Sequence, residues 1–512
     1  MQFEVSEPKN RPGVCMTNQS ILIKSLLACC LSLSFAASSR AVEADPQNPG
    51  VVQPFKVWKD VQIPELKKFN APVATRYELA NGMVVFLLED HELPITDLSM
   101  TIRAGDIHEP TELSGINSAV ASIMRSGGSK KYPGDKLDEI LENMAADLSV
   151  GGGQDSGFAS LSTLKDDFDK GLEILVDVLR NPEFPDEKVD LYLAQVRAGI
   201  SKRNDQPGGI ASREFRKNMY GKDSPYAKVV EYANLDKIDR SALSAYHAKI
   251  YHPNIFIVGV VGDFKKDEML AKLKAAFEPW PKADVALPAV PPLPTAHEQR
   301  NLFVERPKIN QTTIMMGHMV DLRRNSPDYA TIQVMNEILA GGMSARMFTE
   351  VRTKKGLAYS VGGAAQIFYN RPGLFYCHAL TRNEQALETV EAIKEEIVRF
   401  RDKGITETEL NEARESILNS FVFNFDSPSK IIGRQMTYEF YGYPMDFAEK
   451  LLENIKRVTV ADVNRAATQY LDPEKMQLIG VGNTAALDKA KSFNSLPDVK
   501  LLDVTIPPPT KK

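Results

Sequence analysis

Apolar residues recur along the chain with two different periods. Some segments have the period typical of strands, and others have the period typical of helices. Leu98, Met100 and Ile102 are separated by polar residues, as in a strand with one buried face. Longer segments with apolar residues at helical spacing follow, and they predict helices over residues 115–126, 133–146, 165–180 and 186–204.

A hairpin is predicted ahead of these helices. Asn81-Gly82 separates two strand-like segments, residues 77–79 and 83–88, and favours a type I′ turn because Asn and Gly tolerate positive φ. Hairpins followed by long helices predict an α+β fold, in which helices pack on one face of a largely antiparallel sheet.

The pattern occurs twice, with a constant offset. A helical segment, a proline and an apolar strand ending in glycine recur in the same order near residue 250 and near residue 470. Three pairs of landmarks are each 220 residues apart: Ile238 and Val458, Pro253 and Pro473, Gly262 and Gly482. We therefore expect two homologous domains.

The second copy repeats the rhythm of the first. It has long predicted helices over residues 384–403 and 406–424, the latter opened by a capping box from Thr406 to Glu409. Between the copies lies the proline-rich segment Pro281–Arg300, which favours extended chain and is predicted to be a linker. The domains are then expected at residues 72–280 and 301–505, after an extension over residues 45–71.

The first 44 residues have the pattern of a targeting signal. Lys24 precedes the apolar segment Ser25–Ala37, which is too short to cross a bilayer, and small residues follow it. A cleaved signal peptide predicts a periplasmic or secreted protein, with Met16 as an alternative start. A lipoprotein anchor at Cys29 and a mitochondrial presequence are less favoured alternatives, the latter because no Arg-rich amphipathic pattern is present.

Composition excludes some classes of function. The 512 residues are 43% hydrophobic and 25% charged, as in globular proteins of two to four domains. A net charge of -5 gives no basic surface for nucleic acid. No segment after the signal has the 18 or so apolar residues of a membrane helix. Cys377 would remain as a lone thiol after signal removal, so packing alone must hold the domains together.

One predicted helix of the first copy carries a family resemblance. The segment Gly115–Met124, GINSAVASIM, resembles the zinc helix of the pitrilysin (insulinase, inverzincin) family of peptidases. In that family the helix carries His-x-x-Glu-His, and a Glu about 77 positions further on completes the site. Residues at i, i+3 and i+4 share one helix face, so two His bind Zn²⁺ while the Glu polarises its water.

Every position of that zinc site is vacated in this chain. Ser118 and Ser122 stand at the two His positions and Ala121 at the Glu position. Gly199, 77 positions after Ser122, stands at the distal Glu, and Tyr192 replaces an auxiliary Glu. We expect no zinc or other cofactor in this chain. Gly199 is compatible either with close packing in the old pocket or with an empty cleft.

The sequence shows no second metal site and no serine-nucleophile site in place of the zinc site. The seven His residues include no i, i+4 pair beside a carboxylate, so we expect them at the surface or in structural hydrogen bonds. Ser118 and Ser122 are interpreted as small helix-packing residues, because a serine nucleophile needs a base and none is adjacent.

The second copy keeps a different family feature. Residues 339–359, LAGGMSARMFTEVRTKKGLAY, resemble the C-terminal segment of the same family, in which an Arg and a Tyr seven residues apart face the zinc site. Arg352 and Tyr359 have this spacing. A helix over Ser344–Lys355 that stops at Gly356 is predicted, followed by a strand. The resemblance implies that Arg352 and Tyr359 bind the scissile carbonyl and its oxyanion; otherwise, Arg352 caps the helix and Tyr359 packs in the sheet.

The resemblance covers about residues 77–496 and implies the fold of processing peptidases. Some family members divide their labour between a zinc-bearing chain and a chain that supplies the Arg/Tyr pair. We therefore expect a non-catalytic subunit of a heterodimeric zinc peptidase, whose partner holds His-x-x-Glu-His and whose substrate is a peptide. The alternative is a structural or peptide-binding scaffold. An active single-chain protease requires stoichiometric zinc.

Overall fold

The computed structural model describes residues 72–293, 301–486 and 499–509. The predicted signal peptide, the extension up to residue 71 and the last seven residues of the linker lie outside these ranges. Residues 281–293 form neither helix nor strand. No helix among the described residues is long and apolar enough to cross a membrane.

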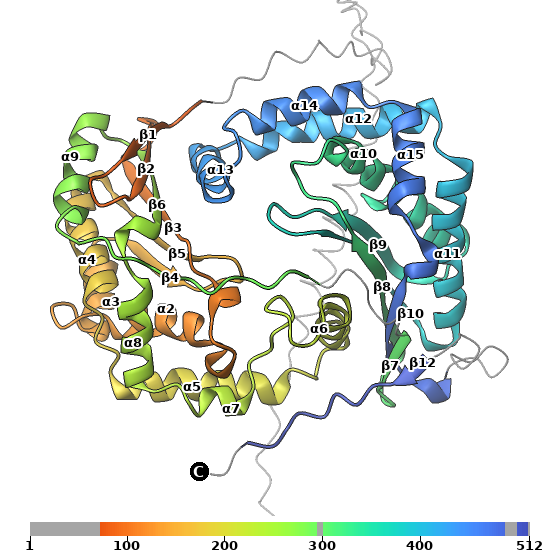
Figure 1. The fold of residues 1–512 in the computed structure, drawn as a ribbon, viewed down its shortest axis with the longest axis horizontal. Coiled ribbons are helices and arrows are strands. Elements are labelled where there is room, and N and C mark those ends of the chain that lie inside the picture. Colours follow the sequence, from red (N-terminus) through yellow and green to blue (C-terminus); the bar gives the residue numbers. More distant parts are fainter. Residues whose placement is uncertain (1–71, 294–300, 487–498, 510–512) are drawn as a thin grey trace, which may run out of the picture. The chain divides into compact units, whose positions relative to one another are not determined.

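The first copy contains a six-stranded sheet (Figure 1). Its strands, in spatial order, are β1 (Thr75–Glu78), β2 (Val84–Glu89), β6 (Phe256–Gly262), β3 (Ile95–Ile102), β5 (Gly157–Leu164) and β4 (Asp147–Gly151). All neighbours are antiparallel except β2 and β6.

The second copy contains a sheet of the same plan. Its order is β12 (Val499–Leu501), β7 (Asn301–Glu305), β11 (Gln477–Gly482), β8 (Gln311–Val320), β10 (Gly373–Arg382) and β9 (Ala358–Gln366). The series β7-β11-β8-β10-β9 repeats β2-β6-β3-β5-β4, including the one parallel pair. Only the outer strands differ, because β12 is parallel to β7 whereas β1 is antiparallel to β2.

Helices are interleaved with the strands along each copy. The first copy has α2 (Ile116–Gly127), α3 (Gly134–Asn143), α4 (Phe168–Arg180), α5 (Asp186–Lys202), α6 (Pro207–Tyr220), α7 (Tyr232–Leu235), α8 (Arg240–Ile250) and α9 (Lys266–Phe277). The second has α10 (Tyr329–Ala340), the π-helix η6 (Phe348–Lys354), α11 (Ala386–Lys403), α12 (Glu407–Phe421), α13 (Pro428–Tyr441), α14 (Phe447–Arg457) and α15 (Val460–Tyr470).

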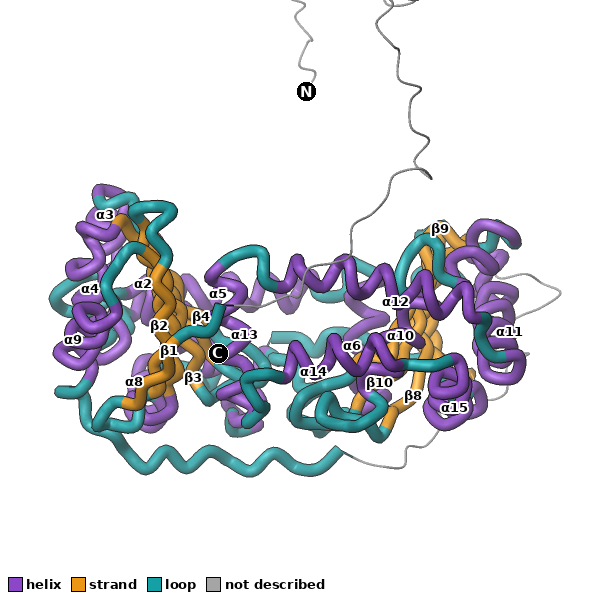
Figure 2. The backbone as a smooth tube through the Cα atoms, turned by 90° about the horizontal axis from the view of Figure 1, so that it is seen from above, coloured by secondary structure: helices purple, strands orange, loops and turns teal. Residues whose placement is uncertain are grey.

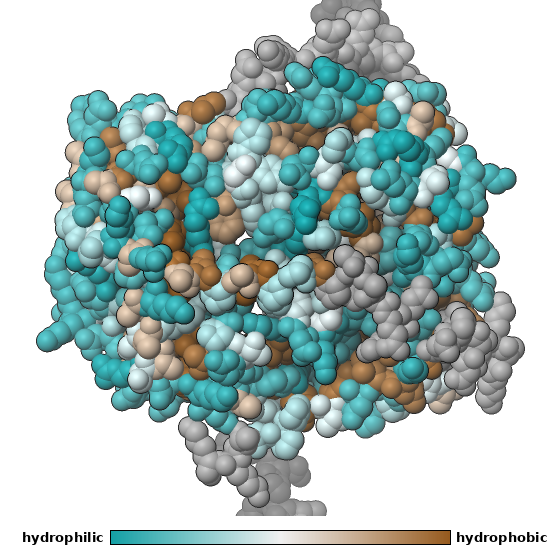
Figure 3. All heavy atoms as spheres, in the orientation of Figure 1, coloured by the Kyte–Doolittle hydropathy of each residue, from teal (hydrophilic) through white to brown (hydrophobic). Residues whose placement is uncertain are grey.

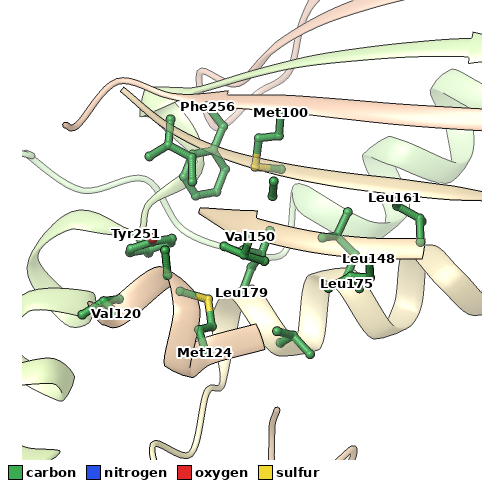
Figure 4. Packing of buried hydrophobic residues seen from close by; sticks show 14 of the residues in the cluster. Met100, Val120, Met124, Leu148, Val150, Leu161, Leu175, Leu179, Tyr251 and Phe256 are labelled. Carbon is green, nitrogen blue, oxygen red and sulfur yellow. The ribbon is translucent and has the colours of Figure 1, made fainter. Parts of the chain in front are cut away.

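The main core of the first copy lies between one sheet face and its own helices. Figure 2 shows α4 and α9 together on one side of this sheet. In Figure 4, Met100 of β3 and Val150 of β4 face Met124 of α2 and Leu179 of α4. The alternation predicted for Leu98, Met100 and Ile102 is confirmed, since all three are buried and the residues between them are only partly buried. The face drawn in Figure 3 is mainly hydrophilic, with hydrophobic patches between.

The opposite face of each sheet is also covered, by a helix of the other copy. Helix α13 packs on β2, β3 and β6, and α6 packs on β8 and β11 (Figure 1). Ile432 and Met436 of α13 share a small core with Phe86 and Ile257. The expectation of helices on one face is therefore incomplete, and the apolar strands β6 and β11 are buried at every residue because they are covered on both faces.

The predicted hairpin forms, but the predicted turn type is wrong. β1 pairs with β2, and the N–H of Gly82 donates to the carbonyl of Leu79 at 2.9 Å. Gly82 has φ of 87°, whereas Asn81 is not in the left-handed region that a type I′ turn requires. The Asn81 side chain instead donates to the carbonyl of Phe277 at 2.8 Å, which ties the turn to the end of α9.

Candidate functional site

Helix α2, which carries three of the vacated zinc positions, begins at an unusual N-terminus. Gly115 precedes it with φ of 96°, where a side chain would be strained and would meet Val230. Both carboxylate oxygens of Glu109 accept backbone N–H groups of this first turn, from Gly115 at 2.9 Å and Asn117 at 2.7 Å. The helix ends at Gly128, with φ of 67°. Glu109 thus caps the N-terminus of α2, whose own N-cap residue makes no side-chain hydrogen bond.

The three positions on α2 differ in their surroundings. Ala121 is buried, Ser118 is half-buried and Ser122 is exposed. The loop after β4 passes close to Ser118, since a Cβ atom at Gly152 would lie 2.9 Å from its Cα and Oγ. Backbone therefore occupies space beside the first of the family's two His positions.

The remaining two positions lie on α5, which packs against α2. Tyr192 is half-buried, and burial raises its pKa to about 12, with the negative charges of Glu109 and Asp106 acting in the same direction. Its phenol is therefore neutral at physiological pH. Gly199 is exposed, and a Cβ atom there would meet nothing within 4 Å. Close packing around Gly199 is therefore wrong, whereas an empty cleft at this position stays a prediction.

A pair of acids beside α2 was missed by sequence reasoning. Asp106 accepts a hydrogen bond from the Asn117 side chain at 2.9 Å, and burial raises the pKa of both Asp106 and Glu109. The value for Glu109 reaches about 7, although two backbone N–H groups favour its ionised form. An acidic residue shortly before a helix indicates capping, but nothing in the sequence indicates burial of this one.

The described residues contain no group of three or more His, Cys, Asp and Glu that could hold a metal ion. The His residues mostly make structural hydrogen bonds. His247 bonds to the carbonyl of Leu179 at 2.8 Å, His318 to that of Met319 at 3.0 Å, and His91 lies 2.6 Å from Asp263. In this part of the chain no hydrogen bond joins a base to Ser118 or Ser122, so neither hydroxyl has an activating partner. His297 lies outside the described residues.

Arg352 and Tyr359 lie on two elements that meet at Gly356. The helix predicted over residues 344–355 forms: residues 346–354 are helical, and Phe348–Lys354 is a π-helix, η6. It stops at Gly356, with φ of 64°, and the N–H of Leu357 donates to the carbonyl of Val351 at 3.1 Å. π-helical segments are rare in proteins, and those that occur often lie at functional sites.

The structure brings the two predicted site residues together. The guanidinium of Arg352 lies 5.7 Å from the ring centre of Tyr359 and 4.6 Å from that of Phe348. Tyr359 is 71% exposed on β9, an edge strand, so it does not pack in the sheet. Glu350 forms ion pairs with Lys354 and Arg399, whereas Arg352 has no ion pair among the described residues. Phe348 is a contact of Arg352 that spacing alone did not reveal.

The two sets of positions are not joined by a direct interaction. Ser118, Ala121 and Ser122 share α2, and Tyr192 and Gly199 share the adjacent α5. In the described part of the chain, the ring contacts of Arg352 join it only to Phe348 and Tyr359. The arrangement provides an exposed cation and a phenol, two donors for an oxyanion.

Two family profiles match the chain. The one described as "Insulinase (Peptidase family M16)" matches residues 84–228. The one described as "Peptidase M16 inactive domain" matches residues 237–417. Together they cover more than half of the 512 residues.

Relatives of similar length match most of the chain. The non-peptidase homolog YmxG of Helicobacter pylori is 22% identical over 401 residues, covering 77% of this chain and 91% of that protein. An uncharacterized zinc protease of Streptomyces coelicolor is 26% identical over 379 residues, covering 72% of this chain and 81% of that protein.

Solved structures have the same fold. The peptidase M16 inactive domain from Pseudomonas fluorescens has a TM-score of 0.73 and 26% identity, covering 81% of this chain and 99% of that chain. The periplasmic protease PqqL from Escherichia coli has a TM-score of 0.68 at 15% identity, covering 91% of this chain and 52% of that chain, which shows the fold alone. The chain belongs to peptidase family M16.

Proposed function

We propose that this chain is the zinc-less subunit of a heterodimeric zinc metallopeptidase. Arg352 and Tyr359 bind the scissile carbonyl and its oxyanion, and the partner supplies zinc and the general base. The observation that carries the proposal is the pairing of an exposed Tyr359 with an Arg352 that has no ion pair among the described residues, 5.7 Å apart. A relative named a non-peptidase homolog and a profile named an inactive domain agree with a non-catalytic role.

Peptide is held by strand addition in this proposal. β9 is the last strand of its sheet, so among the described residues no strand pairs with its outer side. An extended peptide that pairs with such an edge is recognised mainly through its backbone. Tyr359 lies on this strand, close to the peptide that would pair with it.

The proposed location is the periplasm or the outside of the cell. The apolar segment Ser25–Ala37 after Lys24 supports it, since this is the pattern of a cleaved signal. Fractionation of cells that express the tagged full chain tests the location, and a cytosolic product of full length contradicts it.

The central test is reconstitution. The chain is purified alone and with a family homologue that keeps His-x-x-Glu-His, and peptide cleavage and zinc content are measured. Activity above that of the homologue should appear only on mixing, and Arg352→Ala should lower kcat of the mixture about 100-fold, since each oxyanion donor contributes roughly 10²- to 10³-fold. Tyr359→Phe, which removes only the hydroxyl, should also lower kcat.

Arg457→Ala is the matched control, because Arg457 is a highly exposed arginine on α14. A mixture no faster than the homologue alone excludes the proposal. Zinc bound stoichiometrically to the isolated chain would instead support a single-chain protease.

A peptide-binding or structural scaffold is the second candidate. Loss of all five zinc-site positions favours it, because a scaffold needs no metal. This function predicts a stable complex without a gain in rate, and indifference to Tyr359→Phe. A neighbouring gene for an intact homologue favours the two-subunit peptidase.

A further inference from the structure

A cavity of about 390 Å³ lies where α6 of the first copy packs on the second sheet. Met315 of β8, Gln366 of β9 and Tyr376 of β10 contribute to its wall, and Gln154 reaches it from the loop after β4. Its volume is at the small end of the range for ligand-binding cavities. The cavity is separate from Arg352 and Tyr359, neither of which lines it.

Two arginines line the cavity and no carboxylate does. Arg371 comes from the segment between β9 and β10, and Arg216 from α6. The other lining residues are aromatic, aliphatic or uncharged polar residues, including Phe368 and Tyr220. The cavity therefore combines cationic groups with apolar walls.

Arg371 is fixed in place. It is 7% exposed, and its guanidinium lies 3.9 Å from the ring centre of Phe368 and 4.3 Å from that of Tyr226. It donates to both carboxylate oxygens of Asp155 at 3.1 Å and to Gln154 at 3.3 Å. Its Nε has no partner among the described residues. Asp155 balances the charge of Arg371, so this arginine adds a rigid donor surface rather than a net charge.

Arg216 supplies the net charge. It is exposed, and in the described part of the chain no ion pair involves it. Glu214 on the same helix is already paired with Arg213 and Lys217. Tyr220 lines the same cavity as Arg371 and Arg216, and both arginines oppose the rise in its pKa that burial causes. One unbalanced positive charge matches a monoanion better than a doubly charged phosphate.

We propose that this cavity binds the carboxylate of a ligand with an aromatic or aliphatic side chain. Arg216 pairs with the carboxylate, Tyr220 and Arg371 lie beside it, and Phe368 and Met315 contact the side chain. The C-terminal residue of a peptide and a free carboxylic acid share this chemistry. The site does not depend on the proposed role of Arg352 and Tyr359.

Calorimetric titration of the full chain tests the site. The probes are N-acetylphenylalanine and an N-acetylated tetrapeptide ending in Phe, each as the free acid and as the C-terminal amide. The acids should bind and the amides should not. Arg216→Gln should weaken binding about 10- to 100-fold, as expected for loss of a charged hydrogen-bonding partner, and Arg216→Lys should restore part of it.

Arg457→Gln, an exposed change on α14, serves as the control and should leave binding unchanged. Tighter binding of the tetrapeptide acid identifies a peptide C-terminus as the source, and equal binding identifies a free acid. Amides that bind as well as acids, an Arg216→Gln variant with unchanged affinity, or no binding of either acid at about 1 mM would overturn the proposal. Stronger competition by inorganic phosphate than by the acids would also overturn it. Arg216 is suited to this test because it is exposed and forms no ion pair with another described residue.

Discussion

Glu109 binds the first turn of α2 with both of its carboxylate oxygens, yet burial holds its pKa at about 7. The residue is 5% exposed. In the unfolded chain a Glu side chain titrates near 4.3. The folded state therefore binds this proton more tightly than the unfolded state does.

The pH dependence of stability follows from that difference. Between about pH 4.3 and pH 7 the unfolded chain releases the proton first, so the contribution of Glu109 to stability falls as the pH rises. From pH 5 to pH 8 the loss should reach up to about 3 kcal/mol. Urea unfolding at several pH values measures it. Glu109→Gln should reduce this dependence of stability on pH. Glu142→Gln, at an exposed position, is the control and should leave the pH dependence unchanged. Equal pH dependence in wild type and Glu109→Gln would contradict the raised pKa of Glu109.

Two glycines near the vacated zinc positions should respond in opposite ways to alanine. Gly199 lies inside α5 with open space around it, so Gly199→Ala should raise the free energy of unfolding by about 0.5 to 1 kcal/mol. At Gly152 the new Cβ atom would meet Asn117 and Ser118 within 3 Å, so Gly152→Ala should lower the free energy of unfolding by about 1 to 3 kcal/mol. Denaturant unfolding of both variants checks the pair. Equal effects would contradict the contrast between open and closed space.

At the scale of elements, helix α13 contacts the first sheet at a glycine, a residue without a side chain. A Cβ atom at Gly259 of β6 would lie 2.5 Å from Sδ of Met436 and 3.1 Å from Cδ1 of Ile432. The missing side chain lets the helix lie directly on the strand. Arg103 adds hydrogen bonds to the carbonyls of Glu439 and Phe440, at the end of α13, at 3.0 and 2.8 Å.

A large side chain at this contact should displace the helix. Gly259→Leu should lower the free energy of unfolding by about 1 to 3 kcal/mol, because it overpacks the space between α13 and β6. Thermal or urea unfolding measures the loss. The added change Met436→Ala should recover part of it, since the two side chains compete for one space. Gly433→Ala is the control on α13, because nothing lies within 4 Å of its Cβ position; a Gly259→Leu protein as stable as wild type would refute the contact.

Most elements could be predicted from the sequence because local periodicity determines them. The helices α4 and α5 and the strand β3 follow directly from the spacing of apolar residues. The exchange of α6 and α13 could not be predicted in this way, because a helix pattern does not say which sheet it covers. The continuous apolar runs of β6 and of β11 after Gln477 were the available signal, since a strand covered on one face alternates.

The residues of the candidate site also differ in whether local sequence could predict them. Spacing identified Arg352, Tyr359 and the vacated positions, because these share short segments. The environments of Glu109 and Arg371 depend on residues far away in the chain. Arg371 meets Asp155 and Tyr226 only after α6 and the loop after β4 reach the second sheet. Such burial is a property of tertiary structure, so no local pattern reports it.

At the scale of the whole molecule, the two copies complete each other's cores. Ile210, Phe215 and Met219 of α6 pack with Ile479 and Val481 of β11. Arg76 of β1 donates two hydrogen bonds to Glu439, at 3.0 and 2.9 Å. Each copy alone therefore lacks the helix that covers one face of its sheet.

Separated halves should behave accordingly. Residues 72–280 and 301–505, produced as individual polypeptides, should each expose an apolar sheet face and aggregate, because an isolated half leaves side chains such as Phe86 or Ile479 uncovered. Co-expression should yield a soluble complex of one copy of each half. Size-exclusion chromatography with light scattering distinguishes these outcomes. Monomeric, cooperatively folded single halves would contradict the argument.

Because α6 and α13 each pack on the sheet of the other copy, the length of the linker should determine how many chains assemble into one particle. The contacts of each helix with the opposite sheet would be the same if the two halves belonged to different molecules. Shortening Pro281–Arg300 until one half cannot reach its own partner should therefore produce a closed dimer of twice the mass, with both cores intact. In this prediction the proline-rich segment is the spacer that keeps the exchange within one chain.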